Sequence, residues 1–328
     1  MSRRLRRASR GTLPGIAALL VLAAAYPFLF SSALNFGFGV VLFAALATAW
    51  DIIGGRAGQL SLGHAAFVGL GAYTSALLWT RAGVPLLYGL PISMLAGALV
   101  ALIWGFITFR LRGAYFSLAS IAVAEVLRIV ASNWSSLTGG PEGVSVNDAP
   151  TLLGLDLYDR RVQFYLALLL LAVSLLLTWR IGSSRAGFYL DAIREDQDSS
   201  MALGVNPLRM KLIAFCASAM LTCAGGALYA VHLSFFEPHG VFALDLSIQL
   251  VLMSIVGGMG TVFGPALGAL VLLSFQEAFR NVFQQSSLLI YGILIVIIVR
   301  YAPDGLSGRL QLFIRRFVPW AQRSPSAR

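Results

Sequence analysis

The chain has 328 residues, of which 58% are hydrophobic and only 12% are charged. Soluble domains carry about 25% charged residues, so this composition, with a mean hydropathy of +0.80, excludes an ordinary water-soluble domain and indicates a bilayer protein. The formal charge of +10 would indicate nucleic-acid binding in a soluble protein. In a membrane protein it is better explained by basic loops and tails that orient the helices, and we expect no nucleic-acid partner.

Helices that cross a bilayer need about 20 mostly apolar residues. The first stretch is expected to be an uncleaved helix, because its apolar run is longer than that of a signal peptide and no small-x-small cleavage site is followed by a polar mature domain. The sequence thus predicts an all-α polytopic membrane protein of about ten transmembrane helices, of which 246–258 and 287–300 are short and open to a re-entrant interpretation. The candidate spans are 12–30, 35–53, 61–80, 85–109, 114–131, 162–179, 211–232, 246–258, 264–280 and 287–300.

The basic residues predict the orientation of these spans. With the N-terminus in the cytoplasm and the spans alternating, most Arg residues fall in inside segments, as the positive-inside rule requires. Both termini are then cytoplasmic. The predicted parts are a basic N-terminal tail (1–11), a transmembrane domain (12–300) with a periplasmic loop (132–161) and a cytoplasmic loop (181–210), and a basic C-terminal tail (301–328).

Several kinds of chemistry lack their motifs in this sequence. The one lysine, Lys211, is not preceded by a glycine-rich turn, so the chain has no P-loop and is not expected to hydrolyse ATP by that chemistry. No nucleophile elbow and no HExxH motif occur. Cys216 and Cys223 lie two helical turns apart and, with three histidines, show no metal-ligand spacing. We therefore expect no enzyme activity, no cofactor and no metal site.

A glycine-rich polar segment, GGRAGQLSLGHAAF, occupies 54–67. Irregular backbone at membrane depth is tolerated only against protein or a water-filled cavity, so one interpretation is a broken helix that lines a pathway. The other is a cytoplasmic turn followed by a tightly packed Gly/Ala helix. A second glycine-rich stretch at 257–260 weakly repeats the glycine pair at 54–55, and repeats of this kind occur in many transporters. The residues of the candidate substrate pathway are Gln59, Ser61, Gly63, His64, Phe67, Tyr115 and Glu125.

Two charged pairs occur within predicted spans. Glu125 and Arg128 are three residues apart and share a helical face. Charges in a span are costly unless they are paired or hydrated, so the pair is either structural, at the outer helix end, or part of a polar lining near the outer mouth. Glu277 and Arg280 repeat the spacing, with the same two interpretations.

The inside loop at 184–207 is rich in acidic and apolar residues. Asp191, Glu195 and Asp198 would lie on one side of a short helix that Gly204 ends and that Pro207 cannot continue. A helix of this kind fits a groove on a partner protein. A helix lying on lipid headgroups would be basic instead, so the acidic residues favour a protein partner.

Taken in order, five stretches resemble the LivM-type permeases of branched-chain amino acid ABC importers. They are GGRAGQLSLGHAAFVGLGAY (54–73), RLRGAYFSLASIAVAEVLR (110–128), NWSSLTGGPEG (133–143), SRAGFYLDAIREDQDSSMALGVNPLRMKLIAFCASA (184–219) and AGGALYA (224–230). The resemblance implies a ten-helix fold of the type II ABC importer permeases. It also implies four partner chains, namely a LivH-type second permease, two ABC ATPase subunits and a periplasmic amino-acid-binding protein.

The resemblance further implies that the inside loop carries the EAA-type coupling segment, which docks in a cleft of the ATPase. The acid and the glycine of that motif fall on Asp198 and Gly204, whereas its two alanines are replaced by Ser199 and Ser200. The residues expected to couple to the ATPase are Asp191, Arg194, Glu195, Asp196, Asp198, Ala202 and Gly204.

The main hypothesis is therefore a multi-pass permease subunit in the bacterial inner membrane, which translocates branched-chain or related amino acids with energy from separate ATPases. One alternative is a self-contained secondary transporter or channel for a small polar solute. It would need a mid-membrane relay, for which Asp51, His64 and Glu125 are the candidates on different spans. A purely structural membrane subunit is the second alternative.

Overall fold

The computed structural model of the chain describes residues 2–146, 151–152, 155–283, 292, 300 and 305–308, and these are mostly helical. The long helices are α1 (Ser2–Leu29), α2 (Leu34–Asp51), α3 (Ala65–Ala82), α4 (Leu86–Thr108), α5 (Ala114–Asn133), α7 (Arg160–Gly182), α10 (Pro207–Leu233), α12 (Leu244–Gly257) and α13 (Gly264–Phe283). The short helices are η1 (Ser31–Ala33), η2 (Ile52–Arg56), α6 (Ser135–Thr138), η3 (Gly140–Glu142), α8 (Arg185–Glu195), α9 (Gln197–Ala202) and α11 (Pro238–Val241).

Nine of the ten predicted spans coincide with these long helices, and the span predicted at 287–300 lies outside the described residues except for positions 292 and 300. Seven described stretches are long and apolar enough to cross a membrane, which makes the protein a multi-pass membrane protein. The predicted short span at 246–258 belongs to a longer stretch, because α11 and α12 together cover the 20 residues Pro238–Gly257.

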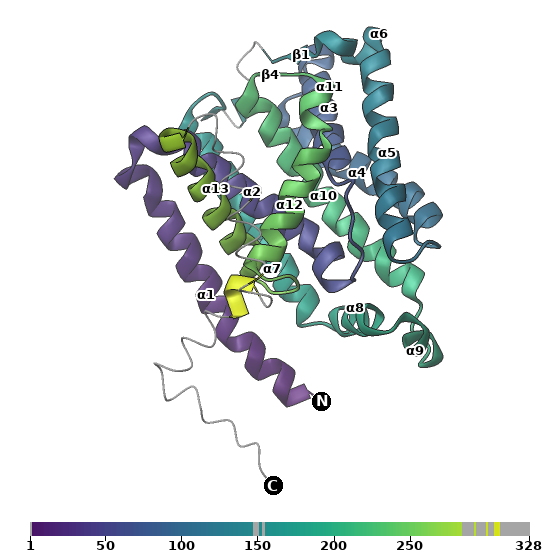
Figure 1. The fold of residues 1–328 in the computed structure, drawn as a ribbon. Helices are drawn as coiled ribbons and strands as arrows, with labels where there is room; N and C mark the ends of the chain where they lie inside the picture. The colour runs from purple at the N-terminus through teal and green to yellow at the C-terminus, as the bar shows by residue number, and fades with distance from the viewer. Residues whose placement is uncertain are drawn as a thin grey trace.

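Helices α2, α3 and α10 form the centre of the bundle. Helix α10 packs against α3, α4 and α2, while α2 also contacts α7, α12 and α13. Glycines permit the close approach of α3 and α10, since a Cβ at Gly71 would strike the backbone of Cys223 and one at Gly226 would strike that of Val68. In Figure 1, α1 and α5 flank this centre on opposite sides.

The two ends of the bundle differ in structure. One end carries α6 and a short antiparallel ladder, in which β1 (Val144–Ser145) pairs with β4 (Phe235–Phe236). A second ladder joins β2 (Thr151–Leu152) to β3 (Leu155–Asp156), so the loop predicted at 132–161 contains strands that an all-α interpretation did not include. Backbone outside the hydrocarbon need not be helical, because water satisfies its polar groups. Helices α8 and α9 lie at the opposite end (Figure 1).

Candidate functional site

The segment between α2 and α3 is a break in the helical structure. Helix α2 runs into a single π-helical turn, η2, and residues 57–64 then follow an irregular course before α3 begins at Ala65. Most of the break is buried, with Ala57 and Ser61 fully inaccessible. The break is thus irregular backbone packed against protein, and it is followed by a helix, α3, whose glycines pack closely on α10. Both features that the two interpretations of the sequence expected are present, and a role of the break as a pathway lining stays a prediction.

His64 is held at the centre of the break by two hydroxyl groups. Its Nδ1 lies 2.9 Å from Ser61 Oγ and its Nε2 lies 2.8 Å from Ser218 Oγ on α10. Ser218 Oγ already donates its proton to Ala49 O at 2.6 Å, so it accepts from His64 Nε2–H. Ser61 Oγ then donates to Nδ1, which makes His64 a neutral Nε2–H tautomer with both nitrogens satisfied.

Helix α5 packs over this break through small polar residues. Ser117 Oγ donates to Leu60 O at 2.7 Å, and Ser120 Oγ accepts from Leu62 N at 2.9 Å. A Cβ at Gly63 would strike the carbonyl of Ser120, so only glycine permits this contact. The break and the first half of α5 therefore form one packed unit.

The structure divides the predicted pathway residues into two groups. One group lies within the protein, where Ser61, His64 and Phe67 are inaccessible, Gln59 is 9% exposed and Gly63 is buried. The other group lies on the outward face of α5, where Tyr115 is 73% exposed and Glu125 is about half exposed. Their assignment to a substrate pathway stays a prediction.

Glu125 belongs to a charged cluster on this outward face. The Arg128 guanidinium donates to both oxygens of Glu125, from Nε to Oε2 at 2.9 Å and from Nη2 to Oε1. Its third nitrogen, Nη1, lies 2.9 Å from Nδ1 and 3.0 Å from Nε2 of His239 on α11. The Glu125–Arg128 pair follows from the sequence spacing, but His239 is 111 residues away and carries no sequence signal for this contact.

The inside loop forms two short helices rather than the one predicted. Asp196 has extended backbone between α8 and α9, and its carboxylate accepts hydrogen bonds from Asp198 N at 2.9 Å and Ser199 N at 3.1 Å. These bonds from Ser199 and Asp198 lower the pKa of Asp196, so the cap stays charged at neutral pH. The aspartate that was expected inside a helix therefore begins one, because it is a strong N-cap residue.

Gly204 ends this pair of helices as the sequence indicates. Its φ of +83° is a left-handed conformation that suits glycine just beyond a helix end. Pro207 does more than stop the preceding helix, since it is the first residue of α10. Proline is well suited to that position because the first helical N–H has no partner within the helix.

Two polar contacts tie α9 to the membrane helices. Arg112, in the turn between α4 and α5, makes a bidentate pair with Asp198, with both N–O distances at 2.9 Å. Lys211 in the first turns of α10 donates from Nζ to Gln197 Oε1 at 2.7 Å, and its side chain is almost fully buried. Helix α9 is therefore hydrogen-bonded both to the turn before α5 and to the first turns of α10.

A third contact links the loop to the break. Arg194 at the end of α8 donates from Nη1 to Gly55 O at 2.7 Å. Next to it, the buried Asp51 carboxylate accepts from Gly260 N at 3.0 Å. The two glycine-rich stretches that the sequence shows at 54–55 and 257–260 thus meet beside Arg194 of α8. We call Asp51, Gly55, Arg194 and Gly260 the glycine junction.

The surface of α9 and its flanks is exposed and partly apolar. Leu203 is 84% exposed and Met201 is 42% exposed, although both lie outside the spans. Exposed apolar side chains grouped beside charges are typical of protein interaction sites. Among the predicted coupling residues, Asp191 is half-buried and the rest are exposed, namely Arg194, Glu195, Asp196, Asp198, Ala202 and Gly204.

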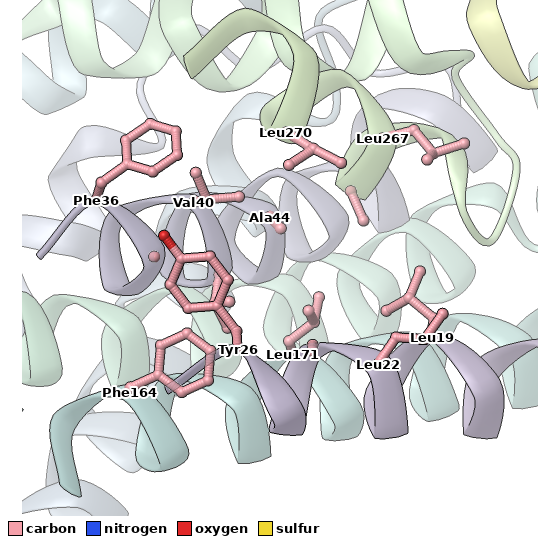
Figure 2. A pocket seen from close by; sticks show the side chains of 14 residues that line it. Leu19, Leu22, Tyr26, Phe36, Val40, Ala44, Phe164, Leu171, Leu267 and Leu270 are labelled. Carbon is pink, nitrogen blue, oxygen red and sulfur yellow. The ribbon is translucent and has the colours of Figure 1, made fainter. Parts of the chain in front are cut away.

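An apolar cavity of 480 Å³ lies elsewhere, between α1, α2, α7 and α13 (Figure 2). Its lining is hydrocarbon except for Tyr26, whose hydroxyl donates to Ala33 O at 3.2 Å. None of the predicted pathway residues lines it. A hydrocarbon group would fit this lining, whereas a charged group would find no hydrogen-bond or ionic partner in it.

Residues that the sequence analysis did not assign to a site are Arg112, Gln197 and Lys211, which anchor α9. Arg112 had a usable signal, because a basic turn at 110–112 lies on the same predicted side of the membrane as the acidic loop. Lys211 also stands out because it is the one lysine in the chain, and the other 23 of the 24 Lys and Arg residues are arginines.

A bundle with several helices long and apolar enough to cross a bilayer defines a multi-pass membrane protein. Sequence comparison then identifies the family. The pattern described as "Branched-chain amino acid transport system / permease component" matches residues 16–299, and the chain belongs to this family.

Three relatives illustrate the range of the similarity. The LivM permease protein of the high-affinity branched-chain amino acid transport system of Escherichia coli K12 is 33% identical over 315 residues, which cover 89% of this chain and 74% of the relative. A probable LivM of Methanocaldococcus jannaschii is 24% identical over 236 residues, covering 67% and 68%. The autoinducer 2 import permease LsrC of Salmonella typhimurium is 22% identical over 200 residues, covering 58% and 55%. No solved structure matches the chain.

Proposed function

We propose that this permease carries branched-chain or related amino acids into the cytoplasm as one subunit of an ABC importer, driven by two separate ATPase subunits. The chain's membership of the permease family supports the transport role. The names of the LivM relatives support the substrate class. A LivH-type second permease and a periplasmic amino-acid-binding protein complete the proposed assembly in the bacterial inner membrane.

The observation that carries the coupling role is the position of α9. This helix is exposed to a partner through Met201 and Leu203, yet it is held to α5 and α10 by Arg112 and Lys211. A helix that contacts a partner on one side and is bonded to the membrane helices on the other can transmit a displacement from the partner to those helices. Closure of the ATPases would move α9, and its anchors would carry the motion to the helices around the break.

The proposed topology has ten spans, with 287–300 as the tenth, and both termini in the cytoplasm. The loop at 181–210 is then cytoplasmic and the loop at 132–161 periplasmic, and the tails are 1–11 and 301–328. The placement of these loops at opposite ends of the bundle supports this arrangement (Figure 1). ATP hydrolysis would reside in the partner chains.

Gly204→Arg tests the coupling role. The variant places a bulky cation on the α9 surface, where nothing lies within 4 Å of the added Cβ, so we expect uptake of labelled leucine by the assembled importer to fall about tenfold or more. The matched control is Gly83→Arg, at the C-terminal end of α3. Gly83 also has a positive φ, and nothing lies within 4 Å of an added Cβ there. Both variants have a similar backbone cost, of about 1–2 kcal/mol.

The control should keep uptake within about twofold of the unmodified protein. Membrane levels of both variants are measured by immunoblot. Normal uptake by a Gly204→Arg protein that is present in the membrane would contradict the coupling role.

The hypothesis of a self-contained secondary transporter receives no support from the geometry of the described residues. Asp51 binds Gly260 N, His64 binds two serines, and Glu125 binds Arg128. These three residues share no hydrogen bond with one another in that part of the chain. Gradient-driven leucine uptake by the reconstituted chain alone would favour that hypothesis instead.

A further inference from the structure

The outward face of α5 combines exposure, membrane depth and charge in an unusual way. The helix satisfies the criteria for a membrane span, yet only 22% of its span window is buried within the protein. Glu125 is the twelfth of its 20 residues, about 16 Å from the start at 1.5 Å per residue. This half-exposed carboxylate therefore lies inside the stretch that meets the criteria for a span, away from both of its ends.

A carboxylate facing lipid at this depth would be costly even when paired with Arg128. The face therefore contacts protein or a polar pathway in the working assembly. His239 reaches Arg128 from α11, so two separate segments of the chain contribute to the cluster. If Glu125 and Arg128 served only to neutralise each other's charge, the contact of His239 with Arg128 would not be required.

The remaining surface of the same face is apolar. Leu118, Val126 and Ile129 are 63%, 57% and 47% exposed, and Ala122 is exposed between them. These positions follow one another at helical spacings of three and four residues, in line with Glu125. The face thus presents one fixed positive charge, one fixed negative charge and an adjoining hydrocarbon stripe.

A zwitterionic amino acid with a branched apolar side chain is complementary to this arrangement. A planar guanidinium binds a carboxylate through two parallel hydrogen bonds, and a carboxylate accepts from an ammonium group. About half of the Glu125 side chain is free of contacts and Arg128 retains 20% exposure, so both are accessible to such a ligand. When the ligand binds, the Glu125–Arg128 pair would be replaced by one pair between Glu125 and the ligand's ammonium group and one between Arg128 and its carboxylate. Every charge would then still have an opposite charge beside it.

We propose that Glu125 and Arg128 form a transient subsite for the ammonium and carboxylate groups of the transported amino acid, with Leu118, Val126 and Ile129 beside its side chain. His239 is a positioning residue that fixes the Arg128 guanidinium. This inference rests on the proposed function and places recognition of the amino acid in the permease as well as in the binding protein.

The test uses the complete importer in proteoliposomes, with its ATPases, second permease and leucine-loaded binding protein. Glu125→Gln and Arg128→Gln are each expected to lower leucine uptake about tenfold, which corresponds to about 1.4 kcal/mol. Stimulation of ATP hydrolysis by the loaded binding protein should stay within about twofold. The matched control is Glu277→Gln, which removes the acid of the other i,i+3 pair on α13 and should leave uptake unchanged.

A double variant separates a substrate role from a structural one. Glu125→Gln combined with Arg128→Gln retains polar side chains that can bond to each other but has no charges. If the pair is only structural, this neutral pair should restore uptake, and that result would overturn the proposal. Persistent loss of uptake in a correctly assembled double variant supports it.

The positioning role of His239 has its own measurement. His239→Ala should raise the KM for loaded binding protein or leucine by several-fold with a smaller change in maximal rate, and His239→Gln should restore the KM in part. Unchanged kinetics in His239→Ala would remove His239 from the subsite. Failure of the unmodified importer to take up any amino acid would instead overturn the proposed function, whereas normal uptake by Glu125→Gln and Arg128→Gln would overturn only this inference.

Discussion

At the scale of single residues, His64 shows how a polar side chain is accommodated in the bundle core. It is fully buried, and Trp50, Phe67 and Phe215 surround it at ring-centroid distances of 6.5, 5.5 and 5.9 Å. The two serine hydroxyls satisfy both ring nitrogens, so the ring stays neutral without an unpaired polar atom. His64 thereby joins the break to α10.

His64→Ala should destabilise the protein by roughly 3 kcal/mol, because it leaves a cavity and deprives Ser61 and Ser218 of their partner. A fall in the temperature of thermal aggregation of the detergent-solubilised protein would show this effect. His239→Ala is the control, since that side chain is exposed and should leave the temperature unchanged. Equal stability of the two variants would show that the His64 contacts contribute little.

At the scale of elements, the α8–α9 segment is a short helical pair held from three sides. Arg112 binds it from the α4–α5 turn, Lys211 binds it from α10, and Arg194 binds the break. The glycine junction continues this chain of contacts to the turn between α12 and α13 through Asp51 and Gly260. These contacts connect the loop to helices from both halves of the sequence, as the proposed coupling role requires.

A charge exchange tests the link between α9 and α5. Asp198→Arg alone and Arg112→Asp alone each place like charges together, so we expect ATP hydrolysis to continue while leucine uptake falls several-fold. Exchange of both residues restores opposite charges and should recover most of the uptake. Because both side chains are well exposed, the pair is expected to contribute little to stability. A double variant as defective as the single ones would show that Asp198 acts through another partner.

At the scale of the whole molecule, the bundle presents different faces to different surroundings. Its ends carry the β1–β4 ladder and the α8–α9 pair, while α1 and α5 form the flanks (Figure 1). The window of α1 is 11% buried and that of α5 is 22% buried, against 78% for the stretch that contains α2. Both flanking helices therefore make few contacts within the chain, and in the proposed assembly α5 would face the second permease or the pathway.

The proposed orientation of the bundle in the membrane can be tested by cysteine labelling. In a chain with Cys216 and Cys223 replaced by alanine, Ser136→Cys should react with a membrane-impermeant maleimide in intact spheroplasts. Ser199→Cys should react only in inside-out vesicles, since both positions are exposed at opposite ends of the bundle. Labelling of position 199 from the outside would reverse the proposed topology and exclude its contact with an ATPase.

The sequence by itself determined the membrane class, the positions of nearly all the long helices and the helix end at Gly204, and it left the break between α2 and α3 as one of two interpretations. These features depend on composition, periodicity and backbone preferences, which act over a few residues. Only the tertiary structure decided the partners, because the contacts join residues far apart in the chain. His64 and Ser218 are 154 residues apart, and Asp51 and Gly260 are 209 apart. Local patterns do not encode which helices pack together, so the anchors of α9 and the contact of His239 with Arg128 emerged only from the folded bundle.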